Sequence, residues 1–145
     1  HRRQKALSLG AHFAVSPDAL PAVLDRESGG RGASVVIEAT GRPEVMAQAL
    51  EIAAFKGRIG YIGIDVGRDA PAKLGLIQSK ELTITGSIGS PGVWPDTLRF
   101  MSQADIDLSS LVTQRFDVET AIDAVAAARN PAETIKAHIE FGASL

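Results

Sequence analysis

Two apolar segments of the sequence each end in a short stretch that contains a glycine. Residues 35–39 (VVIEA) lead into Thr40 and Gly41, and residues 59–61 lead into the stretch 62–64 (IGI). Strands buried on both faces of a parallel sheet have such continuous apolar runs, and doubly wound sheets bind cofactors beyond the carboxyl ends of their strands. We therefore expect both stretches to lie beside a bound ligand and to orient it, rather than to supply an acid or a base.

The other polar residues show few signs of nucleophilic or metal chemistry. The sequence has no cysteine, which excludes a thiolate nucleophile and sulfur ligands for zinc within it. His1, His12 and His138 lack the i, i+4 pairing of a metal site and favour surface or interface positions. No serine lies in a Gly-x-Ser-x-Gly sequence, so a hydrolase nucleophile is not supported. We assign no catalytic and no metal-binding residue.

Glu38 lies inside the first apolar run, where an unpaired carboxylate would be costly to bury. It should therefore face a partner such as an arginine or project toward the ligand crevice. We expect a structural ion pair rather than a catalytic role.

Composition excludes several classes of partner. The chain has 145 residues, of which 45% are hydrophobic and 22% charged, enough for the core of a globular domain. Its 15 basic and 17 acidic residues give a net charge of -2, without the basic stripe that nucleic acid requires. No apolar run is long enough for a membrane span, and the first residues lack the pattern of a signal peptide. We expect a cytoplasmic protein with neither nucleic acid nor membrane as a partner.

Periodicity and turn residues predict strands that alternate with helices up to residue 88. The expected elements are, in order, a helix at 2–9, a strand at 13–15, a helix through Val23 and Leu24 that ends near 28–30, a strand at 34–39, a helix from 43 to 56, a strand at 59–64, a short segment at 73–79 and a strand at 82–85. This alternation indicates a parallel sheet with right-handed crossovers.

After Ile88 the pattern changes. A cluster of glycine, serine and proline at 89–92 breaks it. Beyond the cluster, the expected elements are a helix at 95–103, a strand at 111–116, a helix at 118–128 and a strand at 135–141. We place a domain boundary near Ile88.

The order of these elements and four local strings resemble the C-terminal part of the medium-chain, zinc-type alcohol and polyol dehydrogenases. The strings are residues 5–11 (KALSLGA), 29–41 (GGRGASVVIEATG), 56–58 (KGR) and 135–141 (IKAHIEF). A further stretch, 86–94 (GSIGSPGVW), is similar to the sorbitol, butanediol and threonine dehydrogenase branch. The resemblance covers nearly the whole chain.

The resemblance implies an α/β fold with a partial Rossmann-type, doubly wound parallel sheet that lacks its first two strands, followed by an α+β tail. Residues 1–88 would be the C-terminal portion of the dinucleotide-binding domain, and residues 89–145 the C-terminal segment of the catalytic domain. The family's Gly-x-Gly-x-x-Gly turn and its zinc ligands are not in this sequence. We therefore expect a fragment that is inactive by itself.

The resemblance also implies contacts with a nicotinamide cofactor. The implied residues are Arg2 at the adenosine ribose; Ala39, Thr40, Gly41 and Arg42 on the adenosine side; Ile62, Gly63 and Ile64 against the nicotinamide ring; Ile88 and Gly89 at the turn that leaves the cofactor domain; and Lys136 near the pyrophosphate. Gly63 has no side chain and would let a flat ring come close, or it only relieves crowding at the strand. Lys136 would act as a point charge.

An incomplete sheet has a physical consequence. Without the first two strands, the strand at 34–39 would expose an unpaired edge. We expect that the chain does not form a stable monomer: either the rest of the enzyme completes the sheet, or strands swap or repack. In the family, strands such as the one at 82–85 also pair across a dimer, so a homo-oligomer is expected on two grounds.

The implied reaction is reversible hydride transfer between a small-molecule secondary alcohol or polyol and NAD or NADP. Zinc, held in the parent enzyme outside this segment, would polarise the alcohol oxygen. Two alternatives stay open: a zinc-free quinone or enoyl reductase of the same superfamily, and a non-catalytic binding or assembly module. The residue that selects NAD or NADP is not in the sequence, and the substrate is not readable from it.

Overall fold

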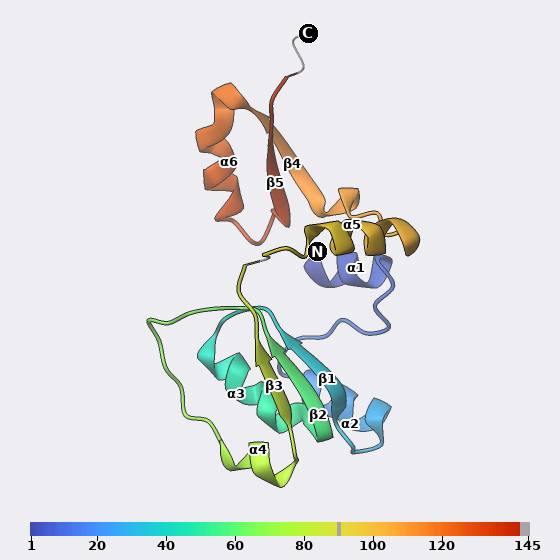
Figure 1. Cartoon of the computed structure of the whole chain (residues 1–145). Helices are drawn as coiled ribbons and strands as arrows, with labels where there is room; N and C mark the ends of the chain where they lie inside the picture. The colour runs from blue at the N-terminus through green and yellow to red at the C-terminus, as the bar shows by residue number, and fades with distance from the viewer. Residues whose placement is uncertain (90, 143–145) are drawn as a thin grey trace. The chain divides into compact units, whose positions relative to one another are not determined.

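The computed structural model describes residues 1–89 and 91–142 (Figure 1). They form two compact units. The first unit is Val15–Ser90, and the second unit combines His1–Ala14 with Pro91–Leu145.

The division between the units lies close to the boundary expected near Ile88. Residues 1–14, however, cluster with the C-terminal segment, whereas the sequence placed them in the first domain. The dinucleotide-binding and catalytic roles given to residues 1–88 and 89–145 stay predictions.

A three-stranded parallel sheet forms the centre of the unit Val15–Ser90 (Figure 1). Its strands are β1 (Ala33–Glu38), β2 (Ala53–Tyr61) and β3 (Thr83–Gly86), in the order β1-β2-β3. All neighbours are parallel, as the alternation of strands and helices predicts. β1 lies at an edge of the sheet, which agrees with the exposed edge expected there.

Helix α2 (Leu20–Ser28) precedes β1, α3 (Pro43–Ile52) connects β1 to β2, and α4 (Gly75–Ser79) lies between β2 and β3. Both α2 and α3 carry a proline in their first turn, where its missing N–H costs nothing. Gly29 ends α2 in the left-handed conformation, with a φ of 60° that suits glycine.

The core of this unit lies on one face of the sheet. It consists of the buried residues Ala49, Leu50, Ala53 and Ile59, with partly buried side chains from α4, β1 and β3 packed against them. Side chains alternate along a strand, so β1 turns its other side chains away from this core. Among these, Ile37 is 62% exposed. The described residues therefore leave this face of β1 open.

The strand predicted at 13–15 is wrong: these residues belong to no strand. A β-strand is defined by a ladder of hydrogen bonds to a neighbour, and the sheet β1-β2-β3 takes in no segment before Ala33.

The junction of α3 and β2 also differs from the prediction. The helix ends at Ile52 rather than near residue 56, and the strand runs Ala53–Tyr61 rather than 59–64. The residues of the stretch 62–64 are therefore a turn after the strand.

Lys80 accounts for the early end of α3. Its Nζ donates hydrogen bonds to the carbonyl oxygens of Leu50, Glu51 and Ala53, at 3.1, 2.7 and 2.7 Å. A cation that binds the last carbonyls of a helix satisfies groups that have no partner inside the helix. Periodicity cannot predict this cap, because it comes from a residue almost thirty positions away.

The second unit contains the helices α1 and α5 and a small β-α-β element. Its members are α1 (Arg2–Ser8), α5 (Trp94–Gln103), η1 (Ser109–Leu111), β4 (Val112–Asp117), η2 (Val118–Thr120), α6 (Ala121–Ala128) and β5 (Lys136–Glu140). β4 and β5 pair in parallel, and α6 packs on both strands. The helix predicted at 118–128 thus begins as a 3-10 turn and continues as α6.

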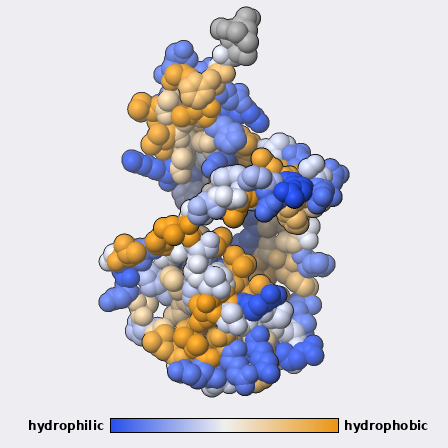
Figure 2. Space-filling view, in the orientation of Figure 1, coloured by the Kyte–Doolittle hydropathy of each residue, from blue (hydrophilic) through white to orange (hydrophobic). Residues whose placement is uncertain are grey.

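Alanine, rather than a large side chain, packs α6 against its strands. Ala124 is buried, whereas Ile122 and Val125 are exposed. Figure 2 shows this hydrophobic surface over α6.

Candidate functional site

The three strands of the sheet end in one row. Glu38, the last residue of β1, pairs with Tyr61, the last residue of β2, and Tyr61 pairs with Gly86, the last residue of β3. The turns that follow therefore leave the sheet at one edge, where doubly wound sheets bind their ligands. The two glycine-bearing stretches adjoin, as expected.

The main chains of the turns 39–42 and 62–64 are in contact. Gly41 has a φ of +70°, and a Cβ there would lie 2.5 Å from the nitrogen of Ile64. A Cβ on Gly63 would lie 2.0 Å from the nitrogen of Gly41. The space beside Gly63, which was expected to admit a flat ring, is therefore occupied by main-chain atoms of Gly41 and Thr40. This geometry agrees with the alternative reading, in which the glycine relieves crowding.

Glu38 is buried, 3% exposed, and binds both turns. Its Oε1 accepts hydrogen bonds from the N–H and the hydroxyl of Thr40 at 2.7 and 2.5 Å, and its Oε2 accepts one from the N–H of Gly41 at 3.2 Å. Its main-chain carbonyl accepts the N–H groups of Ile62 and Gly63 at 2.9 and 3.1 Å. Among the described residues, the partners of the carboxylate are thus the N–H groups of Thr40 and Gly41 and the hydroxyl of Thr40. The prediction of an ion pair with an arginine is wrong. Three nearby donors satisfy the charge instead.

The hydrogen bonds decide the charge state of Glu38. Burial raises the pKa of this carboxyl, but the hydrogen bonds from Thr40 and Gly41 outweigh burial and leave the pKa below its ordinary value of 4.5. The carboxylate is therefore ionised at neutral pH.

We expect Glu38→Gln to lower stability by about 1–3 kcal/mol at neutral pH, since a charge-assisted hydrogen bond is lost and an amide N–H2 faces an N–H. Because the folded pKa is below the unfolded one, the stabilisation by Glu38 is present above the unfolded value of 4.5 and is lost as the pH falls through the folded value. Urea unfolding across this acid range should show that the difference in the free energy of unfolding between the wild type and Glu38→Gln becomes smaller as the pH falls. The other carboxylates titrate in both proteins, so their contributions cancel in this difference. A difference that stays constant down to about pH 3 would contradict this linkage.

A hollow of about 270 Å³ lies between the ends of β2 and β3. It is lined by Tyr61, Gly63, Ile64, Gly86, Ser87 and Ile88. The side chains of Ile64 and Ile88 are 62% and 75% exposed, which is unusual for residues of this size and apolarity. Pockets for drug-sized ligands usually hold about 300–1,000 Å³, so the hollow fits one flat ring rather than a dinucleotide.

The hollow brings together three of the predicted residues, Gly63, Ile64 and Ile88. Ile62 and Gly89 lie in the same turns but outside its lining. Sequence reasoning missed Tyr61, Gly86 and Ser87, and the N–H of Ser87 donates to the Tyr61 carbonyl at 2.9 Å. The sequence does contain a signal for Gly86, because this glycine ends an apolar strand, just as Gly41 and Gly63 each follow one.

Five main-chain donors of these turns are already engaged. N–H groups that donate within the site are those of Thr40, Gly41, Ile62, Gly63 and Ser87. A phosphate cradle needs N–H groups that point at the ligand. This edge of the sheet therefore suits an uncharged ring held by apolar contact, rather than a pyrophosphate.

Arg42, predicted on the adenosine side, is exposed at the start of α3. Its Nε lies 3.8 Å from Oε2 of Glu44, whose Oε1 accepts a hydrogen bond from Arg68 at 2.7 Å. The N–H of Glu44 itself has the largest effect and lowers the pKa of the Glu44 carboxyl; desolvation opposes it, and Arg68 and Arg42 add to the lowering. Two guanidinium groups thus share one carboxylate beside the turn 39–42.

Arg2 and Lys136 belong to the second unit. The guanidinium of Arg2 donates to the carbonyl oxygens of Thr134 and Pro131, at 2.7 and 3.3 Å. Lys136 opens β5 and borders a mostly apolar hollow of about 500 Å³ together with residues around η1. The contacts of both side chains with the adenosine and the pyrophosphate stay predictions.

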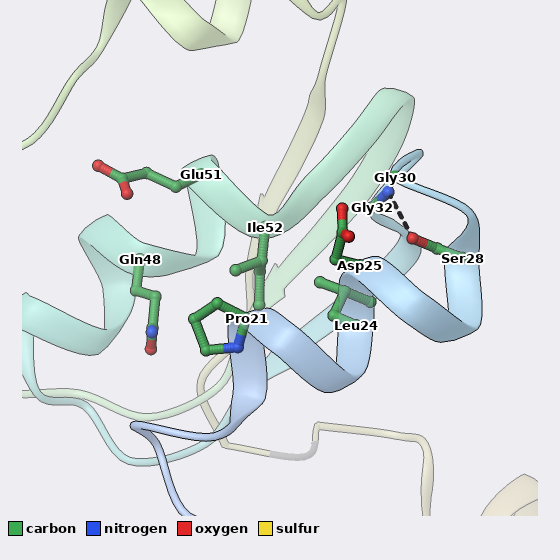
Figure 3. Close-up of a pocket in the computed structure, with 9 residues that line it drawn as sticks. All are labelled: Pro21, Leu24, Asp25, Ser28, Gly30, Gly32, Gln48, Glu51 and Ile52. Carbon is green, nitrogen blue, oxygen red and sulfur yellow. Dashed lines mark hydrogen bonds between the residues drawn. The ribbon is translucent and has the colours of Figure 1, made fainter.

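Another hollow, of about 280 Å³, lies between α2 and α3. Figure 3 shows Pro21 and Leu24 of α2 facing Ile52 of α3. None of the predicted residues lines it, and its Glu51 already pairs with Lys73 at 2.9 Å. We therefore place the candidate site at the strand ends.

The described residues contain no group of three or more histidine, cysteine or acidic side chains that could hold a metal ion. Within the same residues, every helix is too short or too polar to span a lipid bilayer.

Comparison with known proteins gives a consistent result. The profile of a family described as "Zinc-binding dehydrogenase" matches residues 1–103. L-threonine 3-dehydrogenase of Pyrococcus horikoshii is 28% identical over 120 residues, which are 79% of this chain and 34% of that protein. (R,R)-butanediol dehydrogenase of Bacillus subtilis is 31% identical over 125 residues, 84% of this chain and 35% of that protein.

The fold is also that of a solved dehydrogenase. The crystal structure of 2R,3R-butanediol dehydrogenase from Bacillus subtilis superposes with a TM-score of 0.83 and 27% identity, over 96% of this chain and 40% of that chain. This likeness confirms the partial Rossmann-type sheet. The chain spans about a third of the length of the curated relatives that it matches.

Proposed function

The chain belongs to the zinc-binding dehydrogenase family, and on this premise we propose that it is the cofactor-side part of an enzyme that transfers hydride between a secondary alcohol or polyol and NAD or NADP. The observation that carries the proposal is the hollow at the ends of β2 and β3. It combines two exposed isoleucines, engaged N–H groups at Gly63 and Ser87, and a volume suited to one ring.

In this proposal, Ile64 and Ile88 pack against the nicotinamide ring, and the neighbouring Ile62, Gly63 and Gly89 shape the turns that hold it. The bound cofactor supplies the hydride acceptor. The chain's own contribution is orientation: apolar contact excludes water from one face of the ring and fixes the direction in which the other face meets the substrate.

The rest of the cofactor would extend toward charged groups. Ala39, Thr40, Gly41 and Arg42 contact the adenosine side, in a turn with an exposed guanidinium. In the same proposal, Arg2 contacts the adenosine ribose, and Lys136 lies near the pyrophosphate, where it would act as a point charge. These contacts are proposed from the family resemblance and are open to direct test.

The relatives narrow the substrate class. Threonine and butanediol, the substrates in the names of two relatives, both carry a secondary hydroxyl beside a second polar group. We propose a substrate of this kind. The name of the family implies zinc, but the described residues do not form a site for it, so its ligands would lie outside this segment. We further propose a homo-oligomer in the cytoplasm.

The test uses the full-length protein and a titration with NADH and NADPH followed by cofactor fluorescence. We expect saturable binding, and Ile64→Asp should weaken it about tenfold or more, because it places a desolvated charge against an apolar ring. The control is Ile122→Asp, the same change at a residue that is 82% exposed on α6. It should bind as the wild type does.

Two results would count against the proposal. One is the absence of saturable binding at about millimolar cofactor, an affinity too weak for a dedicated site. The other is equal affinity of the wild type and the Ile64→Asp variant. Turnover of secondary alcohols, measured with the cofactor that binds more tightly, then identifies the substrate.

A further inference from the structure

Glu38 connects the two turns of the candidate site. Its carboxylate holds the Thr40–Gly41 turn and its carbonyl holds Ile62 and Gly63. One residue therefore sets the position of both main-chain segments, although its side chain does not line the hollow.

Packing alone does not explain a carboxylate at this position. The side chain is 3% exposed and lies on the core face of β1, next but one to Val36. A branched apolar residue would fill such a site without the cost of burying a charge. All three hydrogen bonds of the carboxylate go to the turn, so its effect is on turn geometry.

Small changes in this turn would reach the hollow. Gly41 packs against Ile64 and Gly63 at distances that leave no room for a single Cβ. A shift of the Thr40 turn must therefore move the residues 63 and 64, which form one wall of the hollow. Main chains packed this closely transmit displacement rather than absorb it.

From these contacts we infer that Glu38 is a positioning residue, which presets the two strand-end turns in the geometry that receives the cofactor ring. This inference rests on the proposed function. Presetting the turns lowers the free energy that would otherwise be spent on ordering them when the cofactor binds.

The test compares the affinities of four variants for NADH in the full-length protein. Glu38→Gln keeps the shape but replaces one acceptor oxygen by a donor, and Thr40→Val removes the hydroxyl at nearly constant shape. Thr40→Ser restores the hydroxyl. The control Glu51→Gln makes the same change as Glu38→Gln at an exposed carboxylate of α3 that pairs with Lys73.

We expect Kd to rise about tenfold in Glu38→Gln and about threefold or more in Thr40→Val. Thr40→Ser, which keeps the hydroxyl, should lose less affinity than Thr40→Val, and the control Glu51→Gln should stay within about twofold of the wild type. The measurements are made at a temperature where circular dichroism shows each variant to be folded. A residue with a purely structural role would lower the unfolding midpoint without changing Kd at that temperature.

Unchanged affinity in folded Glu38→Gln and Thr40→Val would overturn the inference while leaving the proposed function intact. Loss of affinity in Thr40→Ser equal to that in Thr40→Val would also overturn it, because the hydroxyl would then not be what matters. If Glu38→Gln does not fold, the comparison of Thr40→Val with Thr40→Ser decides whether the inference holds. A wild-type protein that binds neither NADH nor NADPH rejects the proposed function, and the inference with it; if only NADPH binds, the four variants are compared with NADPH.

Discussion

Replacing Gly63 by alanine should disrupt both strand-end turns and weaken NADH binding about tenfold or more. The added Cβ would lie 2.0 Å from the nitrogen and 2.7 Å from the Cα of Gly41, and main-chain atoms cannot move aside as a flexible side chain does. Relief requires the turns to separate and the hydrogen bonds from Ile62 and Gly63 to Glu38 to break. We expect a loss of about 2–4 kcal/mol in stability. Urea unfolding followed by circular dichroism, and NADH titration, measure the two effects.

The matched control for this change is Gly75→Ala, at the first residue of α4. A Cβ there would meet no atom within 4 Å, and alanine favours a helix more than glycine does. The control should be neutral or stabilising by up to about 1 kcal/mol. A Gly63→Ala protein as stable as Gly75→Ala, with wild-type affinity for NADH, would show that the turns are not in contact.

Replacing Leu50 by alanine should remove most of the stability of the unit Val15–Ser90. Leu50 is 3% exposed and belongs to the core between α3 and the sheet. Truncating a buried leucine removes apolar contacts and leaves a cavity, which costs about 2–5 kcal/mol. Because Lys80 binds the carbonyl of Leu50, collapse around the cavity would also strain the end of α3. Urea unfolding of the variant gives the difference in free energy.

Leu74→Ala is the corresponding control in the same unit. Leu74 is 64% exposed before α4, so the same loss of methyl groups should change the stability by less than about 1 kcal/mol. If the two variants have similar stability, α3 does not pack on the sheet as described. A larger effect of Leu74→Ala than of Leu50→Ala would instead mean that another surface covers Leu74.

Local patterns were enough for most of the elements. The proline-opened helices, the glycine that ends α2 and the strands β1 and β3 follow from residues within each element. The prediction fails for the end of α3 and for residues 13–15. Both depend on partners elsewhere, in one case the Lys80 ammonium and in the other a neighbouring strand.

For the site, the positions of apolar runs and glycines in the sequence predicted where the turns lie, but not which of their atoms are in contact. The sequence places Thr40 and Ile64 at neighbouring strand ends, and the structure agrees. It could not show that Gly63 makes room for Gly41, because that contact joins residues more than twenty positions apart. The carboxylate of Glu38 was expected to pair with an arginine, but its partners are the N–H groups and the hydroxyl of the next turn, two and three positions along the chain, and hydrophobic periodicity does not predict such local hydrogen bonds.

The amino-acid sequence by itself determined the class of fold and the alternation of strands with helices, because hydrophobic period, proline and glycine act over a few residues. Tertiary structure alone decided where α3 stops, which side chains line the hollow and how closely Gly63 packs against Gly41. These features are set by contacts between residues distant in the chain, and such contacts exist only after β1, β2 and β3 have paired in register.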